Sequence, residues 1–128
     1  MSFNGKILLV DDEPHVRKFV SLILRGLGSP TVIEASSGQE AVERFAAESP
    51  DMVLLDVNMP QMDGVETLRA IMAEHPEALV IMLTSLANRQ TIEQCLAAGA
   101  AGYVRKDTPK EEILAEISAI LEEGANPS

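Results

Sequence analysis

Five polar residues in this 128-residue chain follow or end short apolar runs, and their types could do chemistry together. Asp11 and Asp12 follow KILLV, Asp56 ends MVLLD, Thr84 follows LVIML and Lys106 ends GYVRK. If these runs are parallel strands, their carboxyl ends lie at one edge of a sheet, where open α/β folds place their sites. The sequence therefore predicts that the five side chains converge.

Three carboxylates at one edge would need compensation. Two of them about 5 Å apart repel by roughly 3 kcal/mol at an effective dielectric constant near 20, so a proton or a cation must help. Hard oxygen ligands without His or Cys favour Mg²⁺ (or Mn²⁺) over zinc. A carboxylate beside a metal, a lysine and a hydroxyl has the groups that phosphoryl transfer needs. In this interpretation Asp56 attacks, the metal and Lys106 neutralise the phosphoryl oxygens, and the Thr84 hydroxyl hydrogen-bonds one of them.

The elements that must position these residues alternate along the chain. The apolar runs predict strands at 6–10, 31–34, 52–56, 79–83 and 102–106. Between them, apolar residues recur every three or four positions, which is typical of helices with one buried face. The inward residues predicted for the five helices are Val16, Phe19, Val20, Ile23, Leu24 and Leu27; Ala41, Val42 and Phe45; Val65, Leu68, Ile71 and Met72; Ile92, Cys95 and Leu96; and Ile113, Leu114, Ile117, Ile120 and Leu121.

The predicted helix ends carry capping signals. Pro14 suits a first turn and Gly28 a terminus. The segments 37–40, 63–66 and 108–111 each place a capping residue three positions before a glutamate, which is the pattern of a capping box. Strand followed by helix, five times over, predicts an α/β three-layer sandwich: a five-stranded parallel sheet with helices on both faces.

Composition narrows the functional class. The net charge is −10, from 20 acidic and 10 basic residues, which argues against a nucleic-acid surface and fits a metal cation, a basic partner or mere solubility. One cysteine excludes an internal disulfide. The apolar runs are far shorter than the ~20 residues that span a bilayer, and MSFNG does not open a signal peptide. We therefore expect a cytoplasmic protein, with one domain over residues 1–128 and a short tail or linker start at 124–128.

Four segments together resemble the response-regulator receiver domain of two-component signalling: ILLVDDEP, DMVLLDVNMPQMDG, IMLTS and GYVRKD, in the family's order over about residues 5–122. Within that family, the chain is similar to the single-domain chemotaxis regulator class. The resemblance implies a flavodoxin-like sheet in the order 2-1-3-4-5. It also implies that Asp56 accepts a phosphoryl group from the phosphohistidine of a sensor histidine kinase or a phosphotransfer protein.

The resemblance further implies the roles of the neighbouring residues. Mg²⁺ would lie on Asp11 or Asp12, on Asp56 and on the backbone carbonyl of Asn58, with the second acid of the pair binding it more directly. Thr84 and Tyr103 would form the switch pair. Phosphorylation would then alter the surface of the fourth helix, fifth strand and fifth helix, which would bind a downstream protein or a second copy of the chain.

One position departs from the family pattern. Asp107 follows Lys106 where the family often has proline after a cis peptide. A cis bond before a residue other than proline costs about 3 kcal/mol, so we expect a trans bond, or a cis bond held by the site itself. In the trans case the Asp107 carboxylate points to solvent and does not bind metal.

Two other functional classes stay open. A phosphatase of the haloacid-dehalogenase type also uses an aspartyl nucleophile, but it needs an acid two residues later, where this chain has Asn58. A receiver-like scaffold that has lost its chemistry usually lacks an acid or the lysine, and all are present here. Each residue also has a plainer interpretation: Asp11 and Asp12 as helix caps, Tyr103 as an ordinary strand aromatic.

Overall fold

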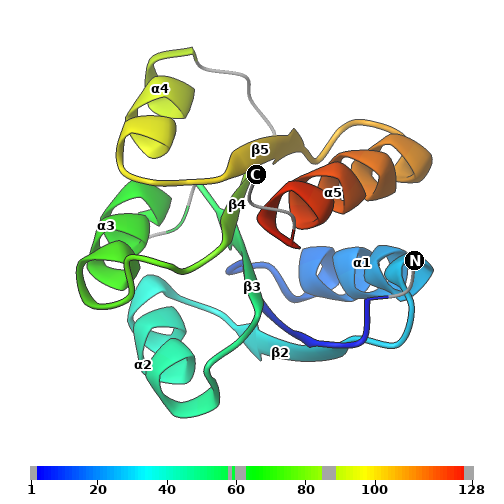
Figure 1. Cartoon of the computed structure of the whole chain (residues 1–128), viewed down its shortest axis with the longest axis horizontal. Helices are drawn as coiled ribbons and strands as arrows, with labels where there is room; N and C mark the ends of the chain where they lie inside the picture. Colours follow the sequence, from blue (N-terminus) through cyan, green and yellow to red (C-terminus); the bar gives the residue numbers. More distant parts are fainter. Residues whose placement is uncertain (1–2, 58, 60–62, 85–88, 126–128) are drawn as a thin grey trace.

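The computed structural model describes residues 3–57, 59, 63–84 and 89–125. A five-stranded parallel sheet forms its centre, in the order β2-β1-β3-β4-β5 (Figure 1). The strands are β1 Lys6–Val10, β2 Thr31–Ala35, β3 Met52–Asp56, β4 Val80–Thr84 and β5 Gly102–Arg105. This is the predicted sheet with the predicted strand order.

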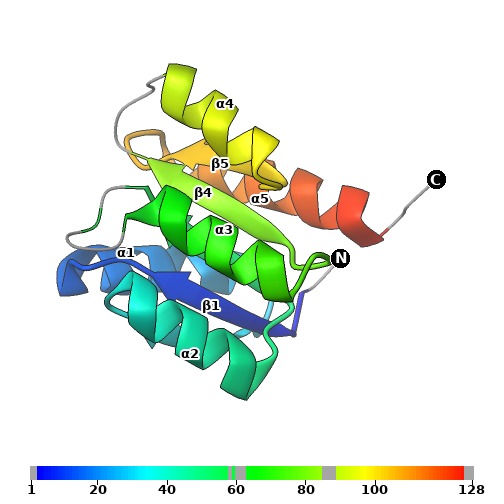
Figure 2. The same cartoon turned by 90° about the vertical axis from the view of Figure 1, so that its left-hand side faces the viewer.

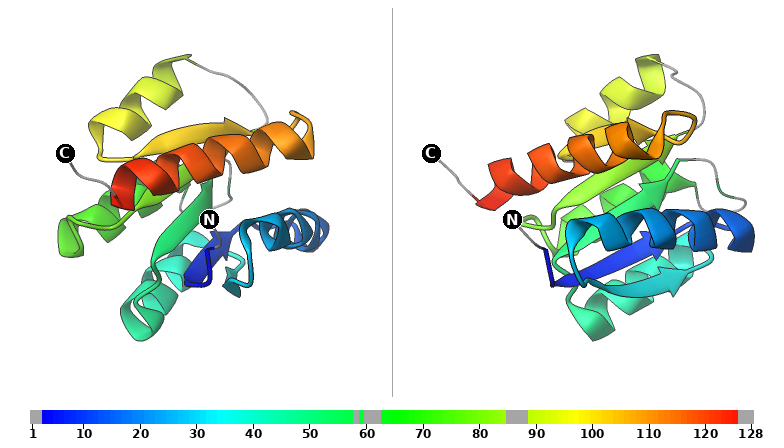
Figure 3. Two further views of the ribbon diagram at one scale, coloured as in Figure 1. Left: turned by 45° about the vertical axis from the view of Figure 1, so that its right-hand side comes forward. Right: turned by 90° about the vertical axis from the view of Figure 1, so that its right-hand side faces the viewer.

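Helices cover both faces of the sheet. They are α1 Pro14–Leu24, α2 Gly38–Glu48, α3 Gly64–Glu74, α4 Arg89–Ala97 and α5 Lys110–Ala125, and the 3₁₀ turn η1 Arg25–Leu27 follows α1. Helices α2, α3 and α4 lie on one face (Figure 2). Helices α1 and α5 contact each other on the opposite face (Figure 3). The predicted three-layer sandwich is confirmed.

Two apolar layers, one on each side of the sheet, hold the strands in place. Alternate residues of each inner strand go to opposite layers, so Leu8 and Val10 pack beneath α2 and α3 while Ile7 and Leu9 pack beneath α1 and α5. Strand β3 is buried along its whole length, Asp56 included. The central strand therefore carries its terminal carboxylate on a backbone that is packed on both sides.

Some predicted details are wrong. Strand β4 is Val80–Thr84 and begins one residue late, and β5 ends at Arg105. Phe19 and Leu96 were expected inward, but they are 53% and 46% exposed. Each stands one helical step of about 100° from the middle of its buried face, where the neighbouring residues Val20 and Cys95 occupy the core.

The capping pattern is confirmed at two helices. The Ser37 side chain accepts from Glu40 N, and the Asp63 side chain accepts from Glu66 N. The reciprocal bond at α2 starts one residue earlier than predicted, because Ser36 N donates to Glu40 Oε1 at 2.6 Å. At α5, the Thr108 hydroxyl donates to the main-chain oxygen of Arg105 at 2.8 Å.

Within the described residues, no helix is both long enough and apolar enough to cross a lipid bilayer.

Candidate functional site

Three aspartates meet at the carboxyl edge of the sheet. Asp11 and Asp12 follow β1, and Asp56 ends β3, the strand paired with β1. Each offers one carboxylate oxygen, and these oxygens all lie within 4.8 Å of one another. Asp11 and Asp56 are buried, at 0% and 3% exposure, while Asp12 is partly exposed. Such a set of hard oxygen donors, open to solvent through one member, fits Mg²⁺ or Mn²⁺.

Lys106 supplies a fixed positive charge to this cluster from beyond the end of β5. Its Nζ lies 2.7 Å from Asp11 Oδ2 and 3.0 Å from Asp56 Oδ1, and its side chain is 17% exposed. Burial lowers the pKa of Lys106, but the hydrogen bonds and charges of Asp11 and Asp56 outweigh that effect and raise the pKa above its usual value. The ammonium therefore persists well beyond neutral pH, and it bridges the two buried acids.

Asp11 is held by the protein at every polar atom. Its N–H donates to Ala35 O at 3.1 Å, and its own carbonyl accepts from Arg17 Nη1 at 2.7 Å. Its Oδ1 accepts from Glu13 N at 2.9 Å, and its Oδ2 accepts from Lys106. Both carboxylate oxygens of Asp11 are engaged by the protein, so its position beside Asp12 and Asp56 is fixed. Asp12 is more exposed and is the acid of the pair that a ligand from solvent can reach.

Thr84 ends β4 between β3 and β5. It is 3% exposed, and its main-chain oxygen accepts from Lys106 N at 2.8 Å. Leu83, the residue before it, pairs in register with Asp56. The backbone thus joins the ends of β3, β4 and β5 into one edge, as the sequence predicted.

Gly64 allows α3 to begin directly against the end of β3. Its N–H donates to Val57 O at 2.9 Å. A Cβ at this position would overlap the main-chain oxygen of Asp56 and lie 2.7 Å from the Cα of Val57. Only glycine fits this close approach, so the residue after the Asp63 cap is part of how the site is held.

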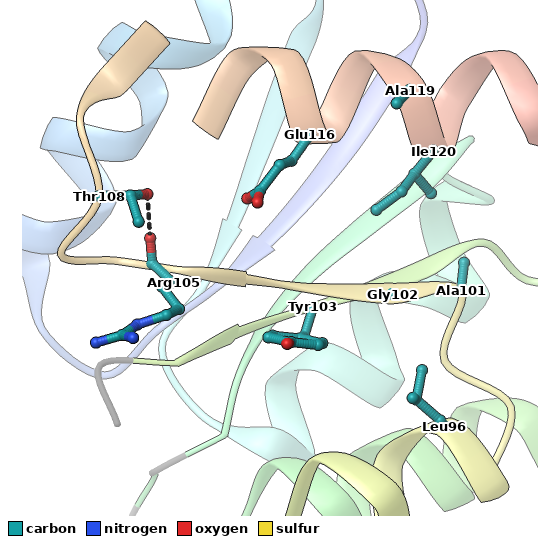
Figure 4. Close-up of a pocket in the computed structure, with 9 residues that line it drawn as sticks. All are labelled: Leu96, Ala101, Gly102, Tyr103, Arg105, Thr108, Glu116, Ala119 and Ile120. Atoms are coloured by element: carbon teal, nitrogen blue, oxygen red, sulfur yellow. Dashed lines mark hydrogen bonds between the residues drawn. The ribbon is translucent and has the colours of Figure 1, made fainter. Parts of the chain in front are cut away.

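Tyr103 is the predicted site residue that lies away from the acids. It is exposed and lines a groove of about 510 Å³ that wraps around the edge strand β5. Figure 4 shows Tyr103 and Leu96 on the α4 side of β5, with Ala119 and Ile120 on the α5 side. In register, Tyr103 pairs with Met82 and Arg105 with Thr84, so strand alternation places Tyr103 and Thr84 on the same face of the sheet.

The peptide after Lys106 was in doubt because Asp107 stands where the family often has proline after a cis bond. The described residues contain no cis peptide bond, so Lys106–Asp107 is trans. The Asp107 carboxylate is half exposed, as expected, but it has a partner that the sequence did not predict. Arg105 donates to both of its oxygens, at 3.1 and 2.8 Å.

The structure thus brings Asp11, Asp12, Asp56 and Lys106 together and places Thr84 at the same edge. Asn58, the predicted backbone ligand, lies outside the described residues. Sequence reasoning missed Arg17, which donates to the Asp11 carbonyl, and Glu34, which accepts from Arg17. Their pairing depends on where β2 lies beside β1, and no local sequence pattern gives that.

Comparison with known proteins points to one family. The family model described as the response regulator receiver domain matches residues 7–118. Chemotaxis protein CheY of Listeria monocytogenes is 35% identical over 109 residues, covering 85% of this chain and 92% of that protein. CheY of Bacillus subtilis is 33% identical over 116 residues, covering 91% and 97%.

Solved structures agree with the sequence relatives. The CheX–CheY–BeF₃–Mg²⁺ complex from Borrelia burgdorferi superposes with a TM-score of 0.85 at 30% identity, covering 91% of this chain and 88% of that chain. A LuxR-family response regulator from Aurantimonas gives a TM-score of 0.88 at 30% identity, covering 94% and 86%.

Proposed function

The chain belongs to the response-regulator receiver family, whose members are phosphorylation-dependent signalling switches, and we propose that Asp56 carries the phosphoryl group. One observation supports this assignment above the others. Asp56 is the acid at the tip of the buried central strand, and Lys106 and the acid pair converge on it. A phosphatase and an inactive scaffold are the less favoured alternatives, because the family match covers most of the chain and none of these groups is missing.

The proposed reaction is a direct transfer between two side chains. An oxygen of the Asp56 carboxylate attacks the phosphorus of a phosphohistidine, the new O–P bond forms, and the N–P bond breaks with its electron pair leaving on the imidazole. A carboxylate is already ionised at neutral pH, so the attack needs no general base. Lys106 Nζ, at 3.0 Å from Asp56 Oδ1, faces the charge that gathers on the phosphoryl oxygens.

We assign the metal to Asp12 and Asp56, with Asp11 acting mainly as a fixed neighbour. Asp11 already accepts hydrogen bonds at both carboxylate oxygens, whereas Asp12 is partly exposed beside it. A bound Mg²⁺ would neutralise the phosphoryl oxygens and hold them in line for transfer. The Asn58 carbonyl stays a predicted third ligand.

The switch is proposed to run from Thr84 to Tyr103. Thr84 would hydrogen-bond a phosphoryl oxygen, and Tyr103, on the same face of the sheet and now exposed, would turn inward. The groove between α4, β5 and α5 would then bind a downstream protein, or a second copy of the chain, with altered affinity. A tenfold change in affinity needs only about 1.4 kcal/mol of coupling.

The proposed donor is a sensor histidine kinase or a phosphotransfer protein. In this role the chain modifies itself and turns over no other substrate. The cytoplasmic location and the single-domain organisation expected from the sequence stay predictions.

The test is labelling by a small phosphodonor. With acetyl phosphate and Mg²⁺ the intact chain should gain about 80 Da, the mass of one phosphoryl group, as an adduct that base removes. Asp56→Asn should abolish the gain. The matched control is Asp63→Asn, which changes an exposed helix cap on the neighbouring loop and should keep it. Full labelling of Asp56→Asn would refute the assignment.

A further inference from the structure

Arg17 connects the acid cluster to β2, the edge strand beside β1. It stands in the second turn of α1, and its side chain is only 15% exposed. Its Nη1 donates to the main-chain oxygen of Asp11 at 2.7 Å, and its Nε donates to Glu34 Oε1 at 2.8 Å. Glu34 lies on the edge strand β2, next to Ala35, whose oxygen accepts from Asp11 N at 3.1 Å.

These contacts fix one peptide unit. The carbonyl of Asp11 and the N–H of Asp12 belong to the same planar group. Arg17 holds the oxygen of that group, and the next peptide N–H, that of Glu13, is held by Asp11 Oδ1 at 2.9 Å. The direction in which the Asp12 side chain leaves the backbone is thereby set from both sides.

The guanidinium is suited to this task and a lysine is not. Its planar fork holds two donors at a fixed angle, so one side chain reaches the Asp11 carbonyl and the Glu34 carboxylate together. Glu34 also balances the charge of Arg17. The pair therefore orients the acids with little net effect on the field at the metal site.

We propose that Arg17, held by Glu34, is a positioning residue that orients Asp12 for the divalent cation. The inference rests on the proposed function, since it concerns the same acid pair. It adds a role for two residues that touch neither the cation nor the phosphoryl group.

Positioning and simple charge predict opposite results. If Arg17 acted only as a nearby positive charge, its removal would tighten binding of Mg²⁺. If it orients Asp12, removal weakens binding. Partners that orient metal ligands typically contribute tenfold or more to metal affinity, so Arg17→Gln should raise the dissociation constant of Mg²⁺ about tenfold. Arg17→Lys can keep only one of the two contacts and should fall between the parent and Arg17→Gln.

The experiment is a Mg²⁺ titration followed by the backbone amide signals of Asp12 and Val57, at a temperature where every variant is folded. In EDTA, the amide signal of Asp12 should already shift in Arg17→Gln, because the peptide that joins Asp11 to Asp12 has lost the hydrogen bond that anchors its oxygen, and the amide signal of Glu13, the next one along, should shift with it. The matched control is Arg44→Gln, which removes an exposed arginine paired with Glu40 at 3.9 Å on α2. It should leave both the signals and the affinity unchanged.

Each outcome decides between the two ideas. A Mg²⁺ affinity of Arg17→Gln equal to or tighter than that of the parent overturns the positioning role. If Arg17→Gln does not fold, Arg17→Lys and Glu34→Gln carry the test, and a parental affinity in both overturns it equally. Asp12→Asn separates this inference from the proposed function. If that variant also binds Mg²⁺ as the parent does, the proposed metal site is wrong; if it alone loses binding, only the role of Arg17 is wrong.

Discussion

Lys106 is the residue on which the buried acids depend when no metal is bound. It contacts Asp11 and Asp56, neither of which is more than 4% exposed at the side chain. Removing one partner of a buried ion pair typically costs 3–5 kcal/mol, because a charge stays buried without compensation. We expect Lys106→Gln to lower the free energy of unfolding in EDTA by about 3 kcal/mol.

Mg²⁺ should restore part of this loss, since it supplies positive charge to the same oxygens. Thermal unfolding in EDTA and in millimolar Mg²⁺ measures both effects. Asp12→Asn is the opposing variant: it removes one of three crowded carboxylates, so the apo protein should be as stable as the parent or more so, with less stabilisation by Mg²⁺. An unchanged melting temperature of Lys106→Gln in EDTA would contradict this account.

The ionised Glu40 side chain stabilises the start of α2, and this stabilisation should be lost when Glu40 is protonated at acid pH. The backbone N–H of Ser36 and its hydroxyl both bind Glu40 Oε1, and these bonds lower the pKa of Glu40 below its usual 4.5. A lowered pKa means that the folded state holds the proton less tightly than the unfolded chain. The contribution is therefore complete above the unfolded value and is lost as the pH falls through the folded one.

We thus expect Glu40→Gln to be less stable than the parent at pH 7, and the gap between them in urea melts to close as the pH falls below 4.5 and through the lowered folded-state pKa of Glu40. Arg44→Gln removes a weak contact to the same carboxylate at 3.9 Å and should have a smaller effect. A stability gap between Glu40→Gln and the parent that stays constant from pH 7 to pH 3 would show that the ionised cap contributes nothing.

At the scale of the elements, the start of α3 is set by the contact between Gly64 and the end of β3. Alanine normally stabilises a helix relative to glycine by up to about 1 kcal/mol. At Gly64 we expect the opposite sign, a loss of about 2 kcal/mol or more, because the new methyl group would meet the Asp56 backbone. Urea unfolding measures it, and labelling by acetyl phosphate should slow as well.

Gly26→Ala is the comparison for that variant. Its methyl group would meet the end of the Leu114 side chain at 2.6 Å, and such a terminus can move aside. The loss should be smaller, and phosphoryl labelling should be unchanged. A Gly64→Ala variant as stable as the parent would mean that α3 starts elsewhere without cost.

Periodicity in the sequence was enough to predict the elements but not their edges or their exposed apolar residues. Strand β3 was placed correctly, because a fully apolar run ending in Asp56 has clear limits. Leu79 is equally apolar but precedes β4, so composition alone could not find that boundary. Phe19 belongs to the predicted stripe by spacing, yet it is 53% exposed and lines a cavity of about 140 Å³ together with Lys106 instead of entering the core.

The part of the site that could be predicted from the sequence is the set of residues at the carboxyl ends of the parallel strands. Asp11, Asp56 and Lys106 meet because each stands at the carboxyl end of its strand, and this follows from the parallel direction of the strands together with their order. The bridge from Arg17 to Glu34 depends on side-chain directions across neighbouring elements, and the bidentate pair of Arg105 and Asp107 depends on the turn that follows β5. Those directions are fixed by packing, which one sequence does not display.

For the whole molecule, the proposed switch should be visible as a directional response. Beryllofluoride stands in for the phosphoryl group on an aspartate, and it should shift the amide signals of α4 and β5 more than those of α2. Strand β5 is the sheet edge nearest Thr84, and within α4 Cys95 is the buried residue among those described. Equal shifts in all helices, or none near Tyr103, would argue against the switch.

The contact between Lys106 and Asp11 joins residues 95 positions apart. During translation the acids of β1 and β3 leave the ribosome long before the lysine does, and N-terminal segments begin to fold first. The positive charge of Lys106 can reach the acids only after β5 has been made and has paired with β4. A chain that stops before β5 therefore lacks this lysine, and under the proposed function the ability to take up a phosphoryl group would show that the chain has been made and folded as far as β5.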